Sequence, residues 1–283
     1  MAMSLVNIAN GISGKKMSDT LMDLRHLTWS FTKDSPGTAG MFLKSRCELN
    51  GKQYFLKMSS FNATDGVYGH ECFLEYIASN LADTLGFEHV PYELWYAKVR
   101  IDDKEYTTWI SASEDYRKPG EQRLSLETFY TMNCEPGESL VDFLMRSEFK
   151  DSILKMMMFD YIIYNRDRHS NNIELLYNTA TDTYRMVPMF DHGCSMSSPL
   201  YDKWYTIDES YYLSDKPVNN CIGSKSLKSN LQIVKDHGGK LPLVMITDDI
   251  FDCIDTVMGS IFCDKHLQLL KERYRYGLDF LNS

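Results

Sequence analysis

The sequence predicts an α+β fold with two lobes, a small antiparallel β lobe with one helix and a larger, mainly helical lobe. Two observations lead to this prediction. Short segments of alternating apolar and polar residues, joined by turns, fill the first third of the chain, and one amphipathic helix interrupts them. Beyond a polar connector, the apolar residues recur in longer runs that fit helices. We therefore expect a flexible lead-in over residues 1–19, a small lobe over 20–112 and a large lobe over 113–283.

Turn residues delimit the strands of the small lobe. Asn50-Gly51 is a strong hairpin signal, because both residues adopt the positive φ that a tight two-residue turn requires. Asp102-Asp103 provides a second polar turn. Strands are expected over residues 27–33, 41–49, 53–58, 90–100 and 104–111.

Apolar residues at three- and four-residue steps predict the helix of the small lobe over residues 69–85, and Gly86 is a typical residue to end it. In the large lobe, residues 149–164 are apolar on nearly all sides, which predicts a helix buried in the core. A hairpin of residues 173–177 and 184–188 should then bring Asp191 back beside Asp167. Further helices are expected over residues 137–146 and in the tail from about residue 241.

Composition excludes several classes of protein. A net charge of −9 argues against binding along a nucleic-acid backbone and gives no basic patch for an anionic membrane. Residues 1–16 lack an apolar signal core, which argues against secretion. Aspartates interrupt the apolar stretch 241–262, so it is not expected to span a membrane. Seven scattered cysteines without a C-x-x-C pair fit free thiols in a reducing compartment. We expect a cytoplasmic protein that contacts neither nucleic acid nor membrane directly.

The most informative motif joins an aspartate, an asparagine five residues later and a second aspartate downstream. These residues are Asp167, Asn172 and Asp191, the last of them followed by His192-Gly193. Phosphoryl transfer from ATP needs one carboxylate to orient the attacking hydroxyl, and an amide oxygen with a second carboxylate to hold magnesium. We expect Asp167 to be the catalytic base and Asn172 and Asp191 to bind Mg²⁺, with Asn171 as a rival for Asn172.

A lysine in the third strand is the expected phosphate ligand. Lys57 shares a strand face with Phe55, and a cation on such an apolar face needs a partner. Its position is that of the strand lysine that binds the α- and β-phosphates in kinases. Glu71, early in the following helix, is the expected partner, and Glu75, one turn later, is the alternative.

Two further features belong to the predicted site. The small residues between the first two strands would let backbone N–H groups approach a phosphate. His169, two residues after the expected base, fits a structural role in the loop better than direct proton transfer, and both roles stay open. The residues of the predicted phosphate loop are Ser35, Gly37, Thr38, Ala39 and Gly40.

Taken together, these residues resemble the HipA-like serine/threonine kinases of bacteria. The resemblance runs from about Trp29 to about Pro199 and is most specific in the string Asn-x-Asp-x-His-x-x-Asn that begins at Asn165. It implies a two-lobed protein-kinase-like fold, ATP and Mg²⁺ as cofactors, and a protein substrate with a Ser or Thr acceptor. The chain resembles the short, stand-alone members, because it has no room for the extra N-terminal subdomain of the longer toxins. A regulatory or antitoxin-like partner is left unidentified.

The family resemblance also implies regulation and leaves the acceptor open. Ser35 and Thr38 are the residues of the phosphate loop that autophosphorylation could modify, and the added negative charge should eject ATP. The string Asp-Arg-His-x-x-Asn followed by Asp-x-Gly is also similar to phosphatidylinositol 3- and 4-kinases. A lipid kinase is therefore one alternative.

Two other functions remain as alternatives to a protein kinase. A pseudokinase would bind nucleotide and a partner without turnover. A metal-dependent hydrolase would use Asp167, His169, Asp191 and His192 as converging ligands, and the expected Lys57–Glu71 pair would then have no function.

Overall fold

The computed structural model describes residues 17–31 and 42–283, which divide into two compact units. The smaller unit comprises the described residues up to Tyr68 together with Tyr92–Glu114. The larger unit comprises Gly69–Pro91 and Asp115–Ser283. The helix predicted within residues 69–85 is thus grouped with the larger, mainly helical unit, whereas the sequence-based boundaries place it in the small lobe.

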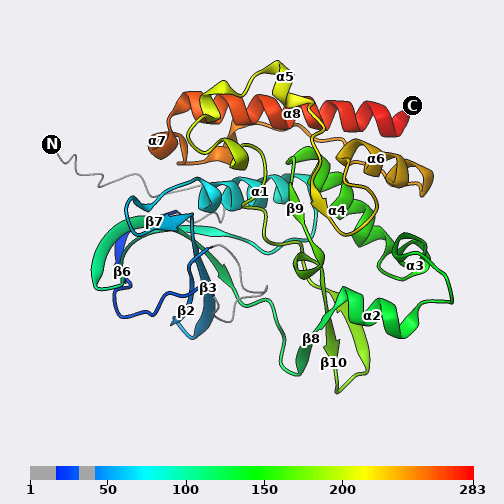
Figure 1. Cartoon of the computed structure of the whole chain (residues 1–283), viewed down its shortest axis with the longest axis horizontal. Helices are drawn as coiled ribbons and strands as arrows, with labels where there is room; N and C mark the ends of the chain where they lie inside the picture. The colour runs from blue at the N-terminus through cyan, green and yellow to red at the C-terminus, as the bar shows by residue number, and fades with distance from the viewer. Residues whose placement is uncertain (1–16, 32–41) are drawn as a thin grey trace. The chain divides into compact units, whose positions relative to one another are not determined.

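The smaller unit is built around a five-stranded sheet in the order β1-β6-β7-β3-β2. Neighbouring strands are antiparallel except β1 and β6, which run parallel. Figure 1 shows the strands β2, β3, β6 and β7 as a strongly curved sheet. A short hairpin of β4 and β5 follows β3. The strands are β1 Met17–Asp23, β2 Lys44–Leu49, β3 Lys52–Met58, β4 Phe61–Asn62, β5 Gly66–Val67, β6 Glu93–Ile101 and β7 Lys104–Glu114.

The period-two pattern of β3 decides which of its residues enter the core of this unit. Tyr54, Leu56 and Met58 are buried in one apolar cluster with residues of β6 and β7. Phe55 and Lys57 lie on the opposite face and are half-buried. The sheet therefore presents Lys57 away from the core, on the face that the sequence predicted.

The first strand differs from the prediction. Met17–Asp23 forms β1 inside and just beyond the stretch expected to be a flexible lead-in. Of the strand expected over residues 27–33, the described part makes only an isolated bridge between Ser30 and Lys44. Period-two reasoning missed β1 because its partner, β6, lies more than seventy residues later in the chain, with Met17 opposite Leu94.

Helix α1 opens the larger unit and spans Glu71–Leu85. Its predicted apolar residues are buried, and so are Glu71 and Glu75, which leaves two carboxylates inside the protein. Gly86 ends the helix in the left-handed conformation (φ 64°), where its N–H bonds back to the last turn. The predicted extent and end of this helix are confirmed.

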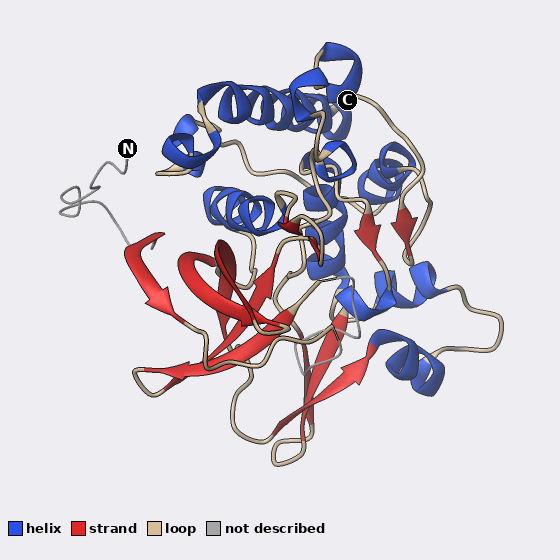
Figure 2. Cartoon of the chain, turned by 60° about the vertical axis from the view of Figure 1, so that its left-hand side comes forward, coloured by secondary structure: helices blue, strands red, loops and turns tan. Residues whose placement is uncertain are grey.

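Helix α4, Lys150–Ile162, is the centre of the larger unit. Residues on all its sides are buried, as its sequence predicted, because α3, α6 and α8 pack around it. Figure 2 shows the predominance of helix in this unit. The other helices are α2 Leu126–Asn133, α3 Leu140–Arg146, α5 Glu209–Tyr212, α6 Leu227–Asp236, α7 Asp255–Met258 and α8 Ser260–Asn282, with 3₁₀ turns η1 Ser170–Asn172, η2 Ser198–Leu200, η3 Trp204–Thr206 and η4 Asp248–Phe251.

Two small sheets complete the larger unit. One has the order β11-β10-β8, in which β10 and β11 form the predicted hairpin. The other consists of β9 and β12, which pair in parallel. These strands are β8 Glu121–Ser125, β9 Asp167–Arg168, β10 Glu174–Asn178, β11 Thr183–Met186 and β12 Asn219–Asn220.

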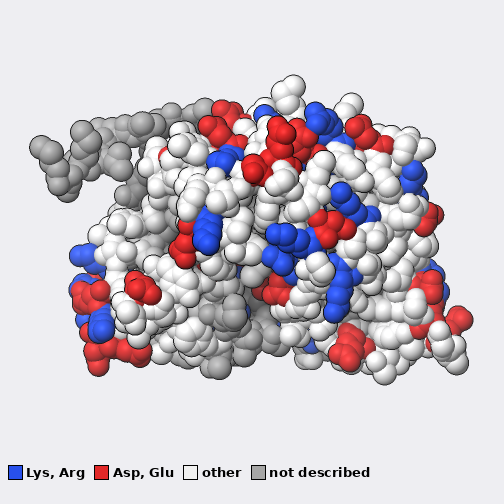
Figure 3. Space-filling model, turned by 45° about the horizontal axis from the view of Figure 1, so that its top comes forward, with Lys and Arg blue, Asp and Glu red and all other residues white. Residues whose placement is uncertain are grey.

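The charged surface and the cysteines can be described directly. On the face shown in Figure 3, Lys and Arg side chains are interspersed with Asp and Glu. None of the seven cysteines, all within the described residues, forms a disulfide. Among the residues that the structure describes, none of the helices is long and apolar enough to cross a membrane.

A buried histidine links α8 to the segment after β11. His266 is fully buried, its ring stacks on Phe262 at 4.0 Å, and its Nε2 lies 2.6 Å from the Ser197 hydroxyl. The Nδ1 lies 2.7 Å from the Phe262 carbonyl oxygen. Burial lowers the pKa of His266 from 6.5 to about 4, because the imidazolium would lose its hydration there.

This histidine predicts an acid-sensitive fold. Between about pH 6.5 and about pH 4 the unfolded chain binds a proton at His266 that the folded chain does not, so stability falls as the pH falls through that window. Between about pH 7 and about pH 5, the unfolding free energy of the His266→Gln variant should therefore fall by about 2 kcal/mol less than that of the unaltered protein. Urea unfolding of both proteins at the two pH values measures it, and parallel pH dependences would contradict it.

Candidate active site

The end of α4 folds the loop that carries Asp167. Tyr164 adopts a positive φ of 51°, which turns the chain sharply after the helix. Asn165 then bonds back to Asp160 twice, through its backbone N–H at 2.8 Å and its side-chain amide at 2.9 Å. The Asn165 side-chain oxygen in turn accepts the backbone N–H of Asp167 at 3.2 Å. One buried asparagine therefore sets the position of the expected base.

Arg168 forms a buried ion pair directly beneath this loop. Its Nε and Nη2 donate to the two carboxylate oxygens of Asp160 at 2.9 and 2.8 Å, and both side chains are almost fully buried. This is the bidentate geometry in which arginine binds a carboxylate most strongly. Burial alone would lower the pKa of Arg168, but the charge and hydrogen bonds of Asp160 outweigh it, so the pKa is raised and the cation persists.

The remaining nitrogen of Arg168 joins the two halves of the predicted magnesium site. Its Nη1 donates to the carbonyl oxygens of Asn172 at 3.1 Å and of Phe190 at 2.9 Å. Phe190 directly precedes Asp191. The backbones next to both expected metal ligands thus converge on one nitrogen atom, although they are separated by 18 residues along the chain.

The turn η1 places Asn172 against Asp167. The Asn172 side-chain amide donates to the Asp167 carbonyl oxygen at 2.9 Å, and its backbone N–H donates to the His169 carbonyl oxygen. His169 caps the turn by accepting the Asn171 N–H on its Nδ1 at 3.2 Å. Because its nitrogen is used in this bond, Asn172 has its amide oxygen as the atom suited to a cation.

The carboxylate of Asp167 is about one-third exposed and lies between two side chains. Its Oδ1 accepts a hydrogen bond of 2.7 Å from the Asn219 side-chain amide. Its Oδ2 lies 3.7 Å from Nε2 of His169. His169 thus lies near the expected base, and Asn219 comes from a stretch whose role the sequence did not indicate.

The segment Asp191–Gly193 packs against α1. Asp191 adopts a positive φ of 59°, an uncommon conformation for a residue with a side chain. The next N–H, that of His192, donates to the buried carboxylate of Glu75 at 2.7 Å. A Cβ atom on Gly193 would lie 3.1 Å from the Cβ of Glu71, so a side chain here would make a tight contact with α1.

Of the two expected phosphate-binding features, the structure describes Lys57, which belongs to the smaller unit. The Lys57 ammonium lies over the ring of Phe42, 4.7 Å from its centre, so the apolar face predicted for this lysine is occupied by an aromatic ring. Glu71, its expected partner, belongs to the larger unit and is fully buried there. Ser35, Gly37, Thr38, Ala39 and Gly40 lie outside the described residues.

The residues around Arg168 fit magnesium chemically. Asn172 and Asp191 would offer an amide oxygen and a carboxylate, the hard ligands that Mg²⁺ takes together with phosphate oxygens and water. The alternative of a metal-dependent hydrolase would instead need His, Asp or Glu side chains that converge on a metal. Within residues 17–31 and 42–283, no three His, Cys, Asp or Glu side chains form a group that could hold a metal.

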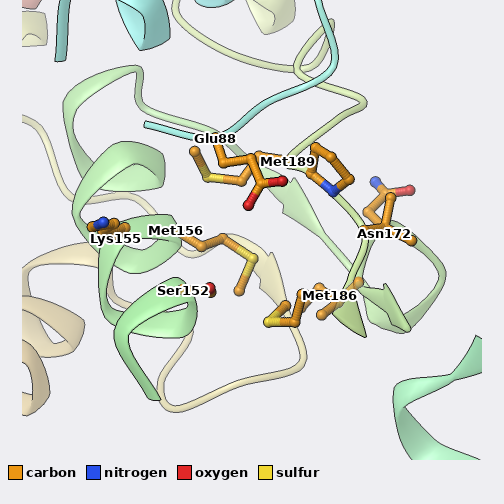
Figure 4. Close-up of a pocket in the computed structure, with 10 residues that line it drawn as sticks. Glu88, Ser152, Lys155, Met156, Asn172, Met186 and Met189 are labelled. Carbon is orange, nitrogen blue, oxygen red and sulfur yellow. The ribbon is translucent and has the colours of Figure 1, made fainter. Parts of the chain in front are cut away.

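A small pocket of about 70 Å³ adjoins Asn172. Figure 4 shows Met156, Met186 and Met189 bordering it, with Glu88 and Asn172 at its edge. A nucleotide needs a site of several hundred Å³, so this pocket does not serve for ATP. It instead marks where methionine side chains from α4 and the β11 segment meet beside the loop.

Several residues of this site carry no sequence motif that could have identified their role. Asp160 lies eight residues before Arg168, a spacing that no loop signature requires. Glu75 was considered only as a partner of Lys57, and its bond to His192 is a contact across 117 residues. The one available signal was polarity. Asp160 lies in the buried, apolar second half of α4, and Asn165 lies shortly after the helix ends, and a buried polar residue needs a partner.

The buried ion pair gives the first test of the site. Replacing Arg168 with Met leaves Asp160 charged and buried and frees two carbonyl oxygens, so it should cost about 3–5 kcal/mol of unfolding free energy. Arg275→Met is the matched control, because its ion pair with Glu272 is exposed and should contribute less than about 1 kcal/mol. Urea unfolding measures both, and equal losses would show that the Arg168 network is not critical.

The chain is similar to known kinases in sequence and in structure. A family model for phosphatidylinositol 3- and 4-kinases matches residues 69–208. The chain is similar in structure to the Helicobacter pylori proinflammatory kinase CtkA, with a TM-score of 0.60 and 17% sequence identity over 93% of this chain and 96% of that one. It is also similar to a chain of the Shewanella oneidensis MR-1 toxin–antitoxin complex of HipA, HipB and operator DNA, with a TM-score of 0.49 and 14% identity over 88% of this chain and 67% of that one.

No curated protein sequence matches the chain. The likeness to CtkA shows the fold, and the family model covers the stretch that contains Asp167, Asn172 and Asp191. The predicted distant similarity to phosphatidylinositol 3- and 4-kinases is confirmed by the family model. The chain has the α+β, protein-kinase-like fold that its sequence predicts.

Proposed function

We propose that this protein is a kinase that uses ATP and Mg²⁺ to phosphorylate a Ser or Thr hydroxyl of a protein. One observation carries the proposal. The loop of Asp167 and Asn172 and the segment of Asp191 meet on the guanidinium of Arg168, which supports a grouping of the proposed base with the two proposed metal ligands. Few other reactions require this combination at this spacing.

In this proposal each residue has a separate task. Asp167 would orient the acceptor hydroxyl and take its proton as the hydroxyl oxygen bonds to the γ-phosphorus of ATP and the bond from that phosphorus to the departing ADP oxygen breaks. Asn172 and Asp191 would hold Mg²⁺ through their oxygens, and the ion would supply charge neutralisation on the phosphates. His169 caps the loop and keeps its Nε2 near Asp167 without being the proton acceptor.

The roles of the smaller unit are carried over from the sequence. Lys57 would bind the α- and β-phosphates, because its ammonium is held on the exposed face of β3 by the Phe42 ring. The stretch Ser35–Gly40 would cover the nucleotide, and Ser35 or Thr38 would be the sites of autophosphorylation. Catalysis by positioning and charge neutralisation makes each metal ligand important.

A lipid acceptor is the second candidate, favoured by the match of residues 69–208 to phosphatidylinositol 3- and 4-kinases. The two candidates share the same site and differ in the acceptor. Incubation with radiolabelled ATP and Mg²⁺, in parallel with protein substrates and with vesicles that contain phosphatidylinositol, separates them. Label in lipid alone would replace the protein acceptor, and ATP binding without turnover would indicate a pseudokinase.

The proposal predicts the effect of neutralising each key carboxylate. Asp167→Asn removes the proposed base, and Asp191→Asn weakens the binding of Mg²⁺. Each substitution should therefore reduce the rate of phosphate transfer by about a thousandfold or more. Asp182→Asn is the matched control, because Asp182 has the same positive φ in the exposed turn between β10 and β11. Transfer rates and urea unfolding should both be measured. Near-normal labelling by the Asp167 and Asp191 variants would refute the assignment.

A further inference from the structure

We propose that Asn219 is a positioning residue that holds the catalytic carboxylate of Asp167 and selects its Oδ2 as the oxygen that receives the acceptor hydroxyl. This inference rests on the proposed kinase function. It gives a role to the segment between α5 and α6, whose sequence contains no recognisable motif.

The two oxygens of Asp167 have different surroundings. Oδ1 accepts the Asn219 side-chain N–H at 2.7 Å, a short distance typical of a hydrogen bond to a charged acceptor. Oδ2 faces His169, whose Nε2 is too far away, at 3.7 Å, for a hydrogen bond. Because Oδ1 already accepts the Asn219 N–H, Oδ2 is the oxygen more available to accept a proton from an incoming hydroxyl.

The backbone fixes Asn219 beside Asp167. Strand β12 runs parallel to β9, with Asn219 opposite Asp167 in the register. The Asn219 N–H donates to the Arg166 carbonyl oxygen at 2.9 Å, and the Cys221 N–H donates to the Arg168 carbonyl oxygen at 3.1 Å. These bonds lie on both sides of Asp167, so the amide of Asn219 cannot slide along the loop without breaking them.

Buried groups anchor the segment that leads into β12. Arg273, fully buried on α8, donates from its Nη1 to the carbonyl oxygens of Tyr212 and Ser214, each at 3.0 Å. The hydroxyl of Tyr164 accepts the Ser214 hydroxyl at 3.1 Å and the Lys216 N–H at 3.2 Å. Tyr164 lies three residues before Asp167. The segment of Asn219 and the loop of Asp167 thus share one anchor.

This arrangement has a chemical consequence. A carboxylate on an exposed loop rotates about its side-chain bonds, and only some orientations point an oxygen at the acceptor. The bond from Asn219 restricts that rotation without supplying or removing a proton. Loss of the bond should therefore lower the rate of the chemical step and leave ATP binding unchanged.

The test compares three variants of the full chain. Asn219→Ala removes the donor, and Asn219→Asp keeps the shape but sets a second carboxylate against Oδ1. Asn220→Ala is the control, because Asn220 lies in the same strand and bonds only within its own turn, to Ile222 and Ser224, in the contacts described. We expect kcat to fall about tenfold in Asn219→Ala, further in Asn219→Asp and little in the control, with KM for ATP unchanged in all three.

A second measurement tests the contact without relying on activity. Urea unfolding of Asn219→Ala, Asp167→Ala and the double variant should give effects that are not additive, because the two side chains interact directly. Additive effects, or a kcat of Asn219→Ala equal to that of Asn220→Ala, would overturn the inference. Inactivity of the unaltered protein toward every acceptor would instead refute the proposed function, and it is recognisable because the coupling in unfolding persists.

Discussion

The site depends on the buried ion pair of Asp160 and Arg168. Taking two charges out of water is costly, and the cost is offset only when the geometry is good and every remaining donor is used. Here two nitrogens of the guanidinium bind the carboxylate, and the third binds two carbonyl oxygens from separate segments. A lysine could not replace this arginine, because one ammonium cannot reach all of these acceptors in fixed directions. The pair thus determines where the chain passes before and after the site, rather than adding stability alone.

In the network around this pair, the residues that support the loop differ from the residue proposed to react. Asp160, Asn165 and Arg168 are buried and use their polar atoms on each other and on the backbone. Asp167 is the member of the loop whose carboxylate remains partly open to solvent. Rigid support behind an accessible reactive group is what catalysis by positioning requires, because small displacements of the reacting atom lower the rate strongly.

The sequence predicted those features that depend on short spacings. The extent of α1, the buried helix α4 and the hairpin of β10 and β11 follow from local periodicity, and the structure confirms them. The convergence of the Asp167 loop on the Asp191 segment was expected from the motif, while the chemical roles of these residues are still predictions. Asn219 and strand β1 could not be found in this way, because each owes its place to a partner more than fifty residues away. Such contacts leave no periodic trace in a single sequence.

The conformation of Asp191 shows how the fold supports a residue at an unfavourable backbone angle. A non-glycine residue at positive φ costs on the order of 1 kcal/mol, so its neighbours must hold it there. The carbonyl oxygen before it is bound by Arg168, and the N–H after it is bound by Glu75, so a buried side chain restrains each side of the residue. Gly193 then lets the chain pass against α1. The buried Glu75 carboxylate thus accepts the N–H that follows Asp191 and helps to fix the segment of the proposed magnesium ligand.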